Sequence, residues 1–188
     1  MNILIITAHP SNLGFTHLIA QTFKEASEKK GHVVEVLDLY RTEIKQSYLS
    51  FEKHPNENSI PGQLEMQEKI LWADQMVFIH PLWWGGVPAI MKNWLDVNLS
   101  SGFAYKYEKN GPKGLLKGKT ARVFITGGGA LWMYLGLGMP FYIIWRVITL
   151  WFCGISMKSF TYFGGKYTHV AGTPNKRLEK VKRIAEKS

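Results

Sequence analysis

Short apolar runs alternate with amphipathic stretches along this chain. Five runs are too short for helices and are bounded by turn formers, so they predict buried strands. They span residues 3–8, 33–37, 76–79, 121–125 and 158–163. Apolar residues at helical spacing occupy most of the intervals. This alternation predicts an α/β fold, a doubly wound sheet of five parallel strands with helices on both faces.

The predicted helices follow from apolar positions three and four residues apart. The first carries Phe15, Leu18, Ile19, Phe23 and Ala26 and ends at Gly31. The second carries Leu64, Gln67, Ile70, Leu71 and Ala73, and the third follows Pro88 with Ile90, Met91, Trp94, Leu95 and Val97. Thr173 as a cap and Pro174 at the first helical position predict a C-terminal helix. Residues 41–62 show little periodicity and predict a long loop with at most one short helical turn.

Residues 130–157 allow more than one interpretation. The stretch from Ala130 to Trp145 carries no charge, and its length would suit a transmembrane helix. Arg146, however, lies near the middle of the whole stretch from Ala130 to Met157, where a charge costs about 2.5–3.5 kcal/mol on membrane insertion. Pro140 and three glycines also interrupt the run. We therefore expect a loop followed by a helix buried in the fold or in a dimer interface, with membrane association as the alternative.

The size and composition predict one folded domain that covers residues 1–188. Hydrophobic residues make up 46% of the 188 residues, enough for a full core. Seven Trp, eight Tyr and ten Phe favour a site that stacks a planar ligand. The net charge of +9 suits an anionic partner. The basic residues form no uninterrupted block, and those near the C-terminus are interspersed with glutamates, which indicates a solvated helix face and argues against nucleic acid.

Cysteine and histidine usage narrows the possible chemistry. Cys153 is the only cysteine, so no internal disulfide forms, and we expect a reducing, cytoplasmic compartment. The apolar stretch at the N-terminus is short and has no charged segment before it, unlike a secretory signal. The histidines show no metal-ligand spacing, so no metal site is predicted. His80, at the end of a predicted strand, is interpreted as structural.

A polar loop follows the first predicted strand and leads into a helix. The N-terminus of a helix presents free backbone N–H groups and the positive end of the helix dipole, which together favour an anion. Ser11, Asn12 and Thr16 add side-chain hydrogen bonds, and His9 adds a donor suited to phosphate. Ser11 and Asn12 alternatively serve as simple N-caps. The loop is neither a Rossmann glycine motif nor a P-loop.

Two further loops follow predicted strands. Pro81, Leu82, Trp83, Trp84, Gly85 and Gly86 come directly after the third, and Thr126, Gly127, Gly128 and Gly129 come after the fourth. Ligands of open α/β sheets bind at the carboxyl ends of the strands, at the topological switch point. We expect the three loops to meet there. The alternative for the tryptophans is a surface loop with its indoles packed on the core.

Taken in order, these segments resemble one family. The matching features are the His9 loop with Phe15, Asp38-Leu39-Tyr40, Pro81 to Ala89, Phe103 to Tyr107, Thr126 to Gly129, Met133-Tyr134 and Phe152-Cys153-Gly154. The chain resembles the flavodoxin-like NAD(P)H:quinone oxidoreductases, the group that includes DT-diaphorase, the modulator-of-drug-activity proteins and the potassium-efflux ancillary flavoproteins. The resemblance implies a flavodoxin-like fold and a noncovalent flavin.

By matching position, the resemblance assigns roles to the three loops. The phosphates of the flavin are assigned to His9, Ser11, Gly14, Phe15 and Thr16. The isoalloxazine is assigned to Pro81, Leu82, Trp83 and Trp84 on one side and to Thr126, Gly127, Gly128 and Gly129 on the other. Tyr134 matches the tyrosine that faces the ring in DT-diaphorase, so the resemblance implies that it is the catalytic residue. FAD is favoured over FMN, because the segments at 152–154 and 173–177 are similar to those of DT-diaphorase.

The resemblance also implies an activity and an assembly. It implies two-electron reduction of quinones or similar acceptors by NAD(P)H, with hydride passing through the flavin in a ping-pong cycle. Tyr105 and Tyr107 match residues that cross a homodimer interface and, with Trp84, shape a shared substrate pocket. Pro140 stands near the place where DT-diaphorase has a histidine, so the acceptor stays open. The alternatives are a flavin-binding regulatory subunit of a membrane transporter, or an electron carrier, whose usual acidic surface is absent here.

Overall fold

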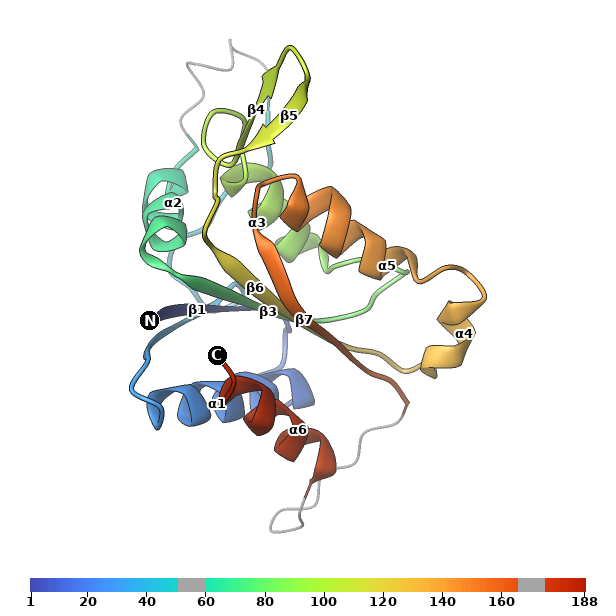
Figure 1. The fold of residues 1–188 in the computed structure, drawn as a ribbon. Coiled ribbons are helices and arrows are strands. Elements are labelled where there is room, and N and C mark those ends of the chain that lie inside the picture. The colour runs from blue at the N-terminus through green and yellow to red at the C-terminus, as the bar shows by residue number, and fades with distance from the viewer. Residues whose placement is uncertain (51–59, 166–174) are drawn as a thin grey trace.

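The computed structural model describes residues 1–50, 60–165 and 175–188, and these form a parallel sheet of five strands (Figure 1). The strands are β1 (Asn2–Thr7), β2 (Val33–Asp38), β3 (Gln75–Pro81), β6 (Thr120–Thr126) and β7 (Ser156–Phe163). Their order across the sheet is β2-β1-β3-β6-β7. The predicted doubly wound fold and its five strands are confirmed.

Helices cover both faces of this sheet, because successive side chains of each buried strand point to opposite sides. Ile3 and Ile5 of β1 pack toward α1 (Phe15–Glu28) and α6 (Lys176–Ala185). Leu4 and Ile6 belong to the opposite core, with α2 (Gln63–Trp72) and α3 (Ala89–Asn98). Figure 1 shows α1 and α6 together on one side of the sheet and α2 and α3 on the other.

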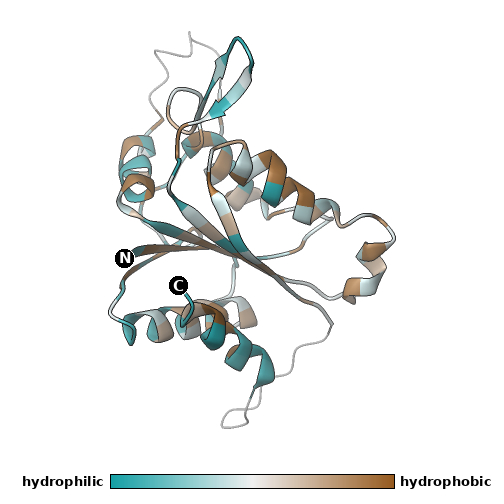
Figure 2. Ribbon diagram, viewed as in Figure 1, coloured by the Kyte–Doolittle hydropathy of each residue, from teal (hydrophilic) through white to brown (hydrophobic). Residues whose placement is uncertain are grey.

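The stretch from 130 to 157 folds into three consecutive short helices. They are α4 (Leu131–Leu135), α5 (Pro140–Ile143) and the π-helix η2 (Ile144–Trp151). Trp145 and Leu150 of η2 are buried, whereas Ile144, Val147, Ile148 and Trp151 are exposed. Much of α4 and η2 is apolar although both lie at the outside of the fold (Figure 2). The predicted buried helix is therefore buried on one side only.

The structure corrects two further details. Residues 105–114 form an antiparallel hairpin of β4 (Tyr105–Glu108) and β5 (Gly111–Gly114), which the sequence pattern did not indicate. The C-terminal helix begins at Lys176, two residues after the predicted start, and Asn175 caps it by accepting a hydrogen bond from the N–H of Arg177 at 3.0 Å. Thr173 and Pro174 lie outside the described residues. No helix of the described ranges is long and apolar enough to span a membrane.

The strand order places the topological switch point between β1 and β3. From β1 the chain moves outward to β2, then returns across β1 to β3 on its other side. Thr7 at the end of β1 lies opposite Ile79, and Pro81 at the end of β3 lies opposite Thr126. The loops that leave β1, β3 and β6 therefore start side by side at one edge, as the sequence predicted.

Candidate functional site: a three-loop cradle at the switch point

The first loop, residues 8–14, ends at a helix whose cap has no side chain. Gly14 is the N-cap of α1, so no side chain at that position satisfies the backbone donors of the first turn. The Ser11 hydroxyl instead accepts a hydrogen bond from the N–H of Leu13 at 3.2 Å. The interpretation of Ser11 as the cap of α1 is therefore wrong. The His9 ring covers Gly14, 3.3 Å from where a Cβ would lie.

Arg41 fixes the backbone of this loop from the side of β2. Its guanidinium donates to the carbonyl oxygens of His9 at 3.3 Å and Pro10 at 2.5 Å, and to the Asp38 carboxylate at 2.7 Å. Two loop carbonyls thus turn toward Arg41, and a cation lies next to the loop. Sequence reasoning missed Arg41, although it directly follows the Asp38-Leu39-Tyr40 segment that was singled out.

The second loop is a tight hairpin turn that presents an indole to solvent. Trp83 and Gly86 exchange two backbone hydrogen bonds, of 3.1 and 2.9 Å. The two residues between them, Trp84 and Gly85, have φ values of 50° and 75°. Left-handed backbone costs about 1–3 kcal/mol for a residue other than glycine. Trp84 adopts this strained conformation, and its side chain is completely exposed. Trp83 is partly exposed, and its ring centroid lies 6.4 Å from that of His9. The alternative in which both indoles pack on the core is wrong.

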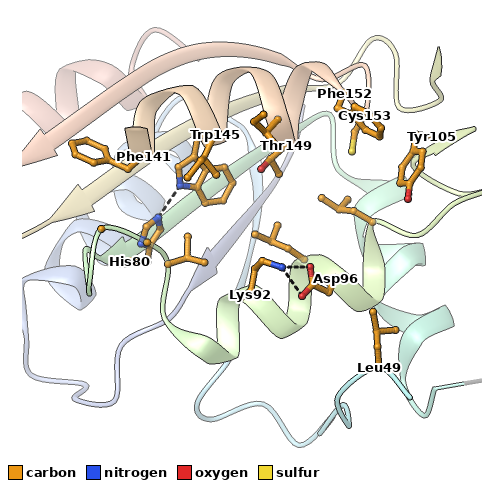
Figure 3. Close-up of a pocket in the computed structure, with 17 residues that line it drawn as sticks. Leu49, His80, Lys92, Asp96, Tyr105, Phe141, Trp145, Thr149, Phe152 and Cys153 are labelled. Atoms are coloured by element: carbon orange, nitrogen blue, oxygen red, sulfur yellow. Dashed lines mark hydrogen bonds and ion pairs between the residues drawn. The ribbon is translucent and has the colours of Figure 1, made fainter. Parts of the chain in front are cut away.

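Near the end of β3, which leads into this turn, His80 makes hydrogen bonds with both of its ring nitrogens. His80 is fully buried, and its Nε2 accepts from the Trp145 indole N–H at 3.1 Å (Figure 3). Because an indole only donates, the His80 proton resides on Nδ1, which donates to the Pro81 carbonyl at 2.8 Å. Burial lowers the pKa of His80 from 6.5 to about 4. The interpretation of His80 as a buried structural histidine agrees with this geometry.

The third loop, residues 126–130, is tied to both of the others. The Thr126 and Thr16 hydroxyl oxygens are 3.3 Å apart, and the Thr126 carbonyl accepts from the N–H of Leu82 at 2.7 Å. A Cβ on Gly127 would lie 2.4 Å from the Tyr162 hydroxyl oxygen, so Tyr162 would have to move to admit a larger residue. A Cβ on Gly128 would meet no described atom within 4 Å. The three loops, residues 8–14, 81–86 and 126–130, together form a cradle that is open at Gly128.

Tyr134 lies beside this third loop. Its hydroxyl oxygen is 3.0 Å from where a Cβ of Gly129 would lie, and its ring packs edge-on against Tyr162 at 5.7 Å. The Tyr162 hydroxyl donates to the carbonyl of Gly129 at 2.7 Å. Burial, together with the neighbouring Tyr134, raises the pKa of Tyr162 to about 12, so it stays a neutral phenol. Tyr162 was also missed, because its position in β7 resembles that of a core aromatic residue.

Tyr105 and Tyr107 lie away from the cradle. They form an aromatic cluster with Phe152, with ring centroids 4.7 to 6.3 Å apart. This cluster lies beyond the C-terminal end of α3, whereas Gly85 and Gly86 lie near its N-terminal end, and ten helical residues span about 15 Å. One chain therefore does not bring these tyrosines onto Trp84.

A groove of about 590 Å³ connects the two ends of α3 (Figure 3). Its walls come mainly from α3 and η2, with Gly85, Gly86 and Val87 at one end and Tyr105, Phe152 and Cys153 at the other. Lys92 and Asp96 form an ion pair of 2.5 Å along the α3 wall. Most of the other groove side chains are apolar. This groove thus runs beside the cradle, on the α3 and η2 side.

The described residues offer little support for metal or thiol chemistry. They contain no group of three or more His, Cys, Asp and Glu residues that could hold a metal ion. Cys153 is buried, and burial raises the pKa of its thiol to about 11. A protonated thiol is a poor nucleophile and a poor metal ligand. Cys153 therefore behaves as the core residue that the sequence predicted.

The cradle combines features that suit a planar, phosphate-bearing ligand. A helix N-terminus and the threonine hydroxyls offer donors, an exposed indole offers a flat apolar surface, and Gly128 leaves space. All of them lie at the carboxyl ends of the strands. Fold and site together define a flavodoxin-like α/β protein with its ligand cradle at the switch point.

The comparisons with known proteins specify the family. The family model described as "Flavodoxin-like fold" matches residues 1–187, and the chain belongs to this family. It is 39% identical over 170 residues to an uncharacterized NAD(P)H oxidoreductase of Haemophilus influenzae, covering 87% of this chain and 84% of that one.

Two solved structures add to this comparison. The NAD(P)H:quinone oxidoreductase from Methanothermobacter marburgensis superposes with a TM-score of 0.80 at 29% identity, over 99% of this chain and 96% of that one. An FMN-dependent NADH-azoreductase from Bacillus anthracis, solved in complex with FMN, shares the fold with a TM-score of 0.71 at 20% identity, over the same shares of the two chains. The sequence relative and the quinone oxidoreductase together identify the chain as an oxidoreductase.

The buried, neutral His80 makes the stability of the protein dependent on pH. The unfolded chain binds a proton at His80 near pH 6.5, whereas the folded chain does so only near pH 4. The stabilisation is complete above pH 6.5 and is lost as the pH falls toward 4. Going from pH 7.5 to pH 5 is expected to remove about 2 kcal/mol of unfolding free energy through this residue.

Urea unfolding at both pH values, for wild type and His80→Phe, measures this contribution. The variant is expected to be less stable at pH 7.5, because Trp145 and the Pro81 carbonyl lose their partner. Its decrease in stability between the two pH values should be smaller than that of wild type by about 2 kcal/mol. Equal decreases in the two proteins would show that His80 does not cause the acid sensitivity.

Proposed function

We propose that this protein catalyses the flavin-dependent, two-electron reduction of quinones or related acceptors by NAD(P)H. The observation that carries the proposal is the strained turn that presents the completely exposed indole of Trp84, in a loop whose neighbouring Trp83 lies 6.4 Å from the His9 ring of the loop before α1. Strained backbone and an exposed aromatic ring are both typical of a ligand site. The sequence relative is named as an NAD(P)H oxidoreductase, and a solved relative as a quinone oxidoreductase.

In this proposal the cradle residues hold the flavin by its two ends. The phosphate contacts would come from His9, Ser11, Gly14, Phe15 and Thr16. The ring contacts would come from Pro81, Leu82, Trp83 and Trp84 and from Thr126, Gly127, Gly128 and Gly129. A bound flavin supplies the hydride chemistry, accepting from NAD(P)H and donating to the acceptor. Trp84 would flank a single slot that both co-substrates enter in turn, which gives a ping-pong cycle.

We infer FMN as the flavin, in place of the FAD expected from the sequence. The structural neighbour from Bacillus anthracis binds FMN on the same fold. The FAD expectation drew on Phe152-Cys153-Gly154, and Phe152 and Cys153 line the far end of the α3 groove instead of the cradle. The other segment, 173–177, lies partly outside the described residues. Neither segment therefore supports the choice of FAD over FMN.

Tyr134 is the proposed catalytic residue. Its hydroxyl lies near Gly129, at the loop whose backbone N–H groups at Gly128 and Gly129 would face the flavin edge. Hydrogen-bond donors at that edge would stabilise negative charge on the reduced ring. Pro140 stands near the place where DT-diaphorase has a histidine. The phenol of Tyr134 and solvent would therefore handle the proton that this histidine is proposed to handle there.

We further propose a homodimer with two shared sites. The exposed apolar side chains of η2 beside the groove are of the kind that monomeric proteins rarely leave uncovered. A two-fold axis through the middle of the groove would exchange its ends. It would carry the Tyr105 and Tyr107 cluster of one protomer onto the Trp84 end of its partner. That arrangement would complete a pocket that one chain leaves open.

The first test is the visible absorption of the purified protein before and after anaerobic addition of NADPH or NADH. We expect a flavin band that bleaches with at least one of them. A band that persists with both nucleotides would favour the regulatory or carrier alternatives, and no binding of FMN or FAD would refute the proposal.

A pair of glycine variants tests the cradle itself. Gly128→Leu should weaken flavin binding at least about tenfold by occupying the open space. Gly136→Leu, also at a glycine with open surroundings, is the matched control.

Tyr134→Phe tests the catalytic assignment. The variant should keep its flavin and its rate of reduction by NAD(P)H, while reduction of the acceptor slows about tenfold or more through loss of one donor. Stopped-flow measurement of the two half-reactions separates these steps. Tyr142→Phe, at the neighbouring tyrosine that bonds Arg146, should leave both rates unchanged. Wild-type kinetics in Tyr134→Phe would remove Tyr134 from the mechanism.

Ile148→Glu tests the shared-site dimer. Ile148 is 62% exposed on η2 at the groove, so a carboxylate there should not disturb a monomer, but it would be buried in the proposed interface. We expect the dimer dissociation constant to rise at least about a hundredfold in sedimentation velocity. Leu64→Glu, at a 76% exposed position of α2, should stay dimeric. A wild-type monomer with full turnover would contradict the shared site.

A further inference from the structure

The hydrogen bonds of His80 converge on one peptide group. The carbonyl of the Pro81–Leu82 peptide accepts from His80 Nδ1 at 2.8 Å, and the N–H of the same peptide donates to the Thr126 carbonyl at 2.7 Å. Both ends of its dipole are therefore held. This peptide is the last rigid unit before the Trp83–Gly86 turn, so its orientation determines where the turn projects.

Trp145 determines which nitrogen of His80 can donate. The indole N–H occupies Nε2, so only the tautomer protonated at Nδ1 satisfies both rings. Trp145 is itself held by Phe78, with ring centroids 4.6 Å apart, and it is 1% exposed. A neutral imidazole without this neighbour would exchange between two tautomers, and one of them presents a lone pair to the Pro81 carbonyl. The indole thus selects the donating form.

We propose that His80 is a positioning residue for the ring of the flavin, holding the Pro81–Leu82 peptide in place while Trp145 fixes its tautomer. The inference rests on the proposed function, because that peptide lies in the segment assigned to the isoalloxazine. His80 does not touch the ligand and transfers no proton, since both of its nitrogens are engaged and its side chain is fully buried. Trp145 acts on the peptide only through its hydrogen bond to His80.

The structure supplies a matched control for Trp145. Trp94 lies in the same core cluster, also packs against Phe78, with centroids 6.2 Å apart, and is 3% exposed. Its indole N–H has no hydrogen-bond partner in the described part of the chain. Replacing either tryptophan by phenylalanine removes similar volume, but only Trp145→Phe removes a hydrogen bond. A difference between the two variants therefore reports the His80 contact and not the cavity.

The test is a fluorescence titration of FMN into apo-protein, with the dissociation constant as readout. Trp145→Phe should weaken FMN binding about five- to tenfold, the equivalent of one lost hydrogen bond, while Trp94→Phe stays within about twofold of wild type. Nitrogen-15 NMR of the histidine rings should show the Nδ1–H tautomer of His80 in wild type and in Trp94→Phe, and a tautomer mixture in Trp145→Phe. Equal dissociation constants for the two variants would refute the positioning role.

Substitutions at His80 itself provide a second, independent measurement. A glutamine amide both donates and accepts, so His80→Gln should bind FMN within about threefold of wild type, whereas His80→Phe should lose about tenfold or more. Equal binding by the two would also refute the inference. A wild-type protein that binds neither FMN nor FAD would instead refute the proposed function, and the inference with it. The two failures are therefore distinguishable.

Discussion

The parallel register of β1, β3 and β6 is the constraint on which the site depends. It places Thr7 opposite Ile79 and Pro81 opposite Thr126, so that three loops leave the sheet at the same edge. Each loop is then fixed by a contact from outside itself. Arg41 holds the first loop, and the Thr126 carbonyl and His80 hold the start of the second. The shape of the cradle is thus held by contacts from the surrounding scaffold.

The cradle and the α3 groove are neighbouring surfaces of different polarity, the cradle polar and the groove mainly apolar. The cradle has a helix N-terminus and threonine hydroxyls, both of which favour an anion, while the Arg41 guanidinium beside it is paired with Asp38. The groove has an ion pair on an otherwise apolar wall, and the η2 side chains beside it are exposed. A ligand with a charged tail and a flat ring suits the first surface. In the proposed dimer a second copy of the chain would cover the other, because a C2 interface pairs the same patch with itself.

The sequence predicted the strands and the strand-end loops, because buried runs, turn residues and strand–helix alternation are local signals. Contacts between distant segments carry no such signal. Arg41 reaches back to Pro10, and Trp145 reaches His80 across 65 positions. Nothing in the spacing indicates these pairs. The apolar stretch at 130–157 likewise shows hydrophobicity but not which side is covered, which is why Ile148 and Trp151 are exposed where a buried helix was expected.

The pairing of His80 with Trp145 also links the two surfaces. Trp145 belongs to η2, whose outer side chains border the groove, and His80 belongs to the strand that ends in the cradle. A displacement of η2 would therefore act on the Pro81–Leu82 peptide through two hydrogen bonds. The wider turns of a π-helix are frequent at functional sites, and here one such helix carries both the groove wall and the indole that holds the strand end. In the proposed dimer, assembly at the groove and ligand binding in the cradle would consequently depend on the same helix.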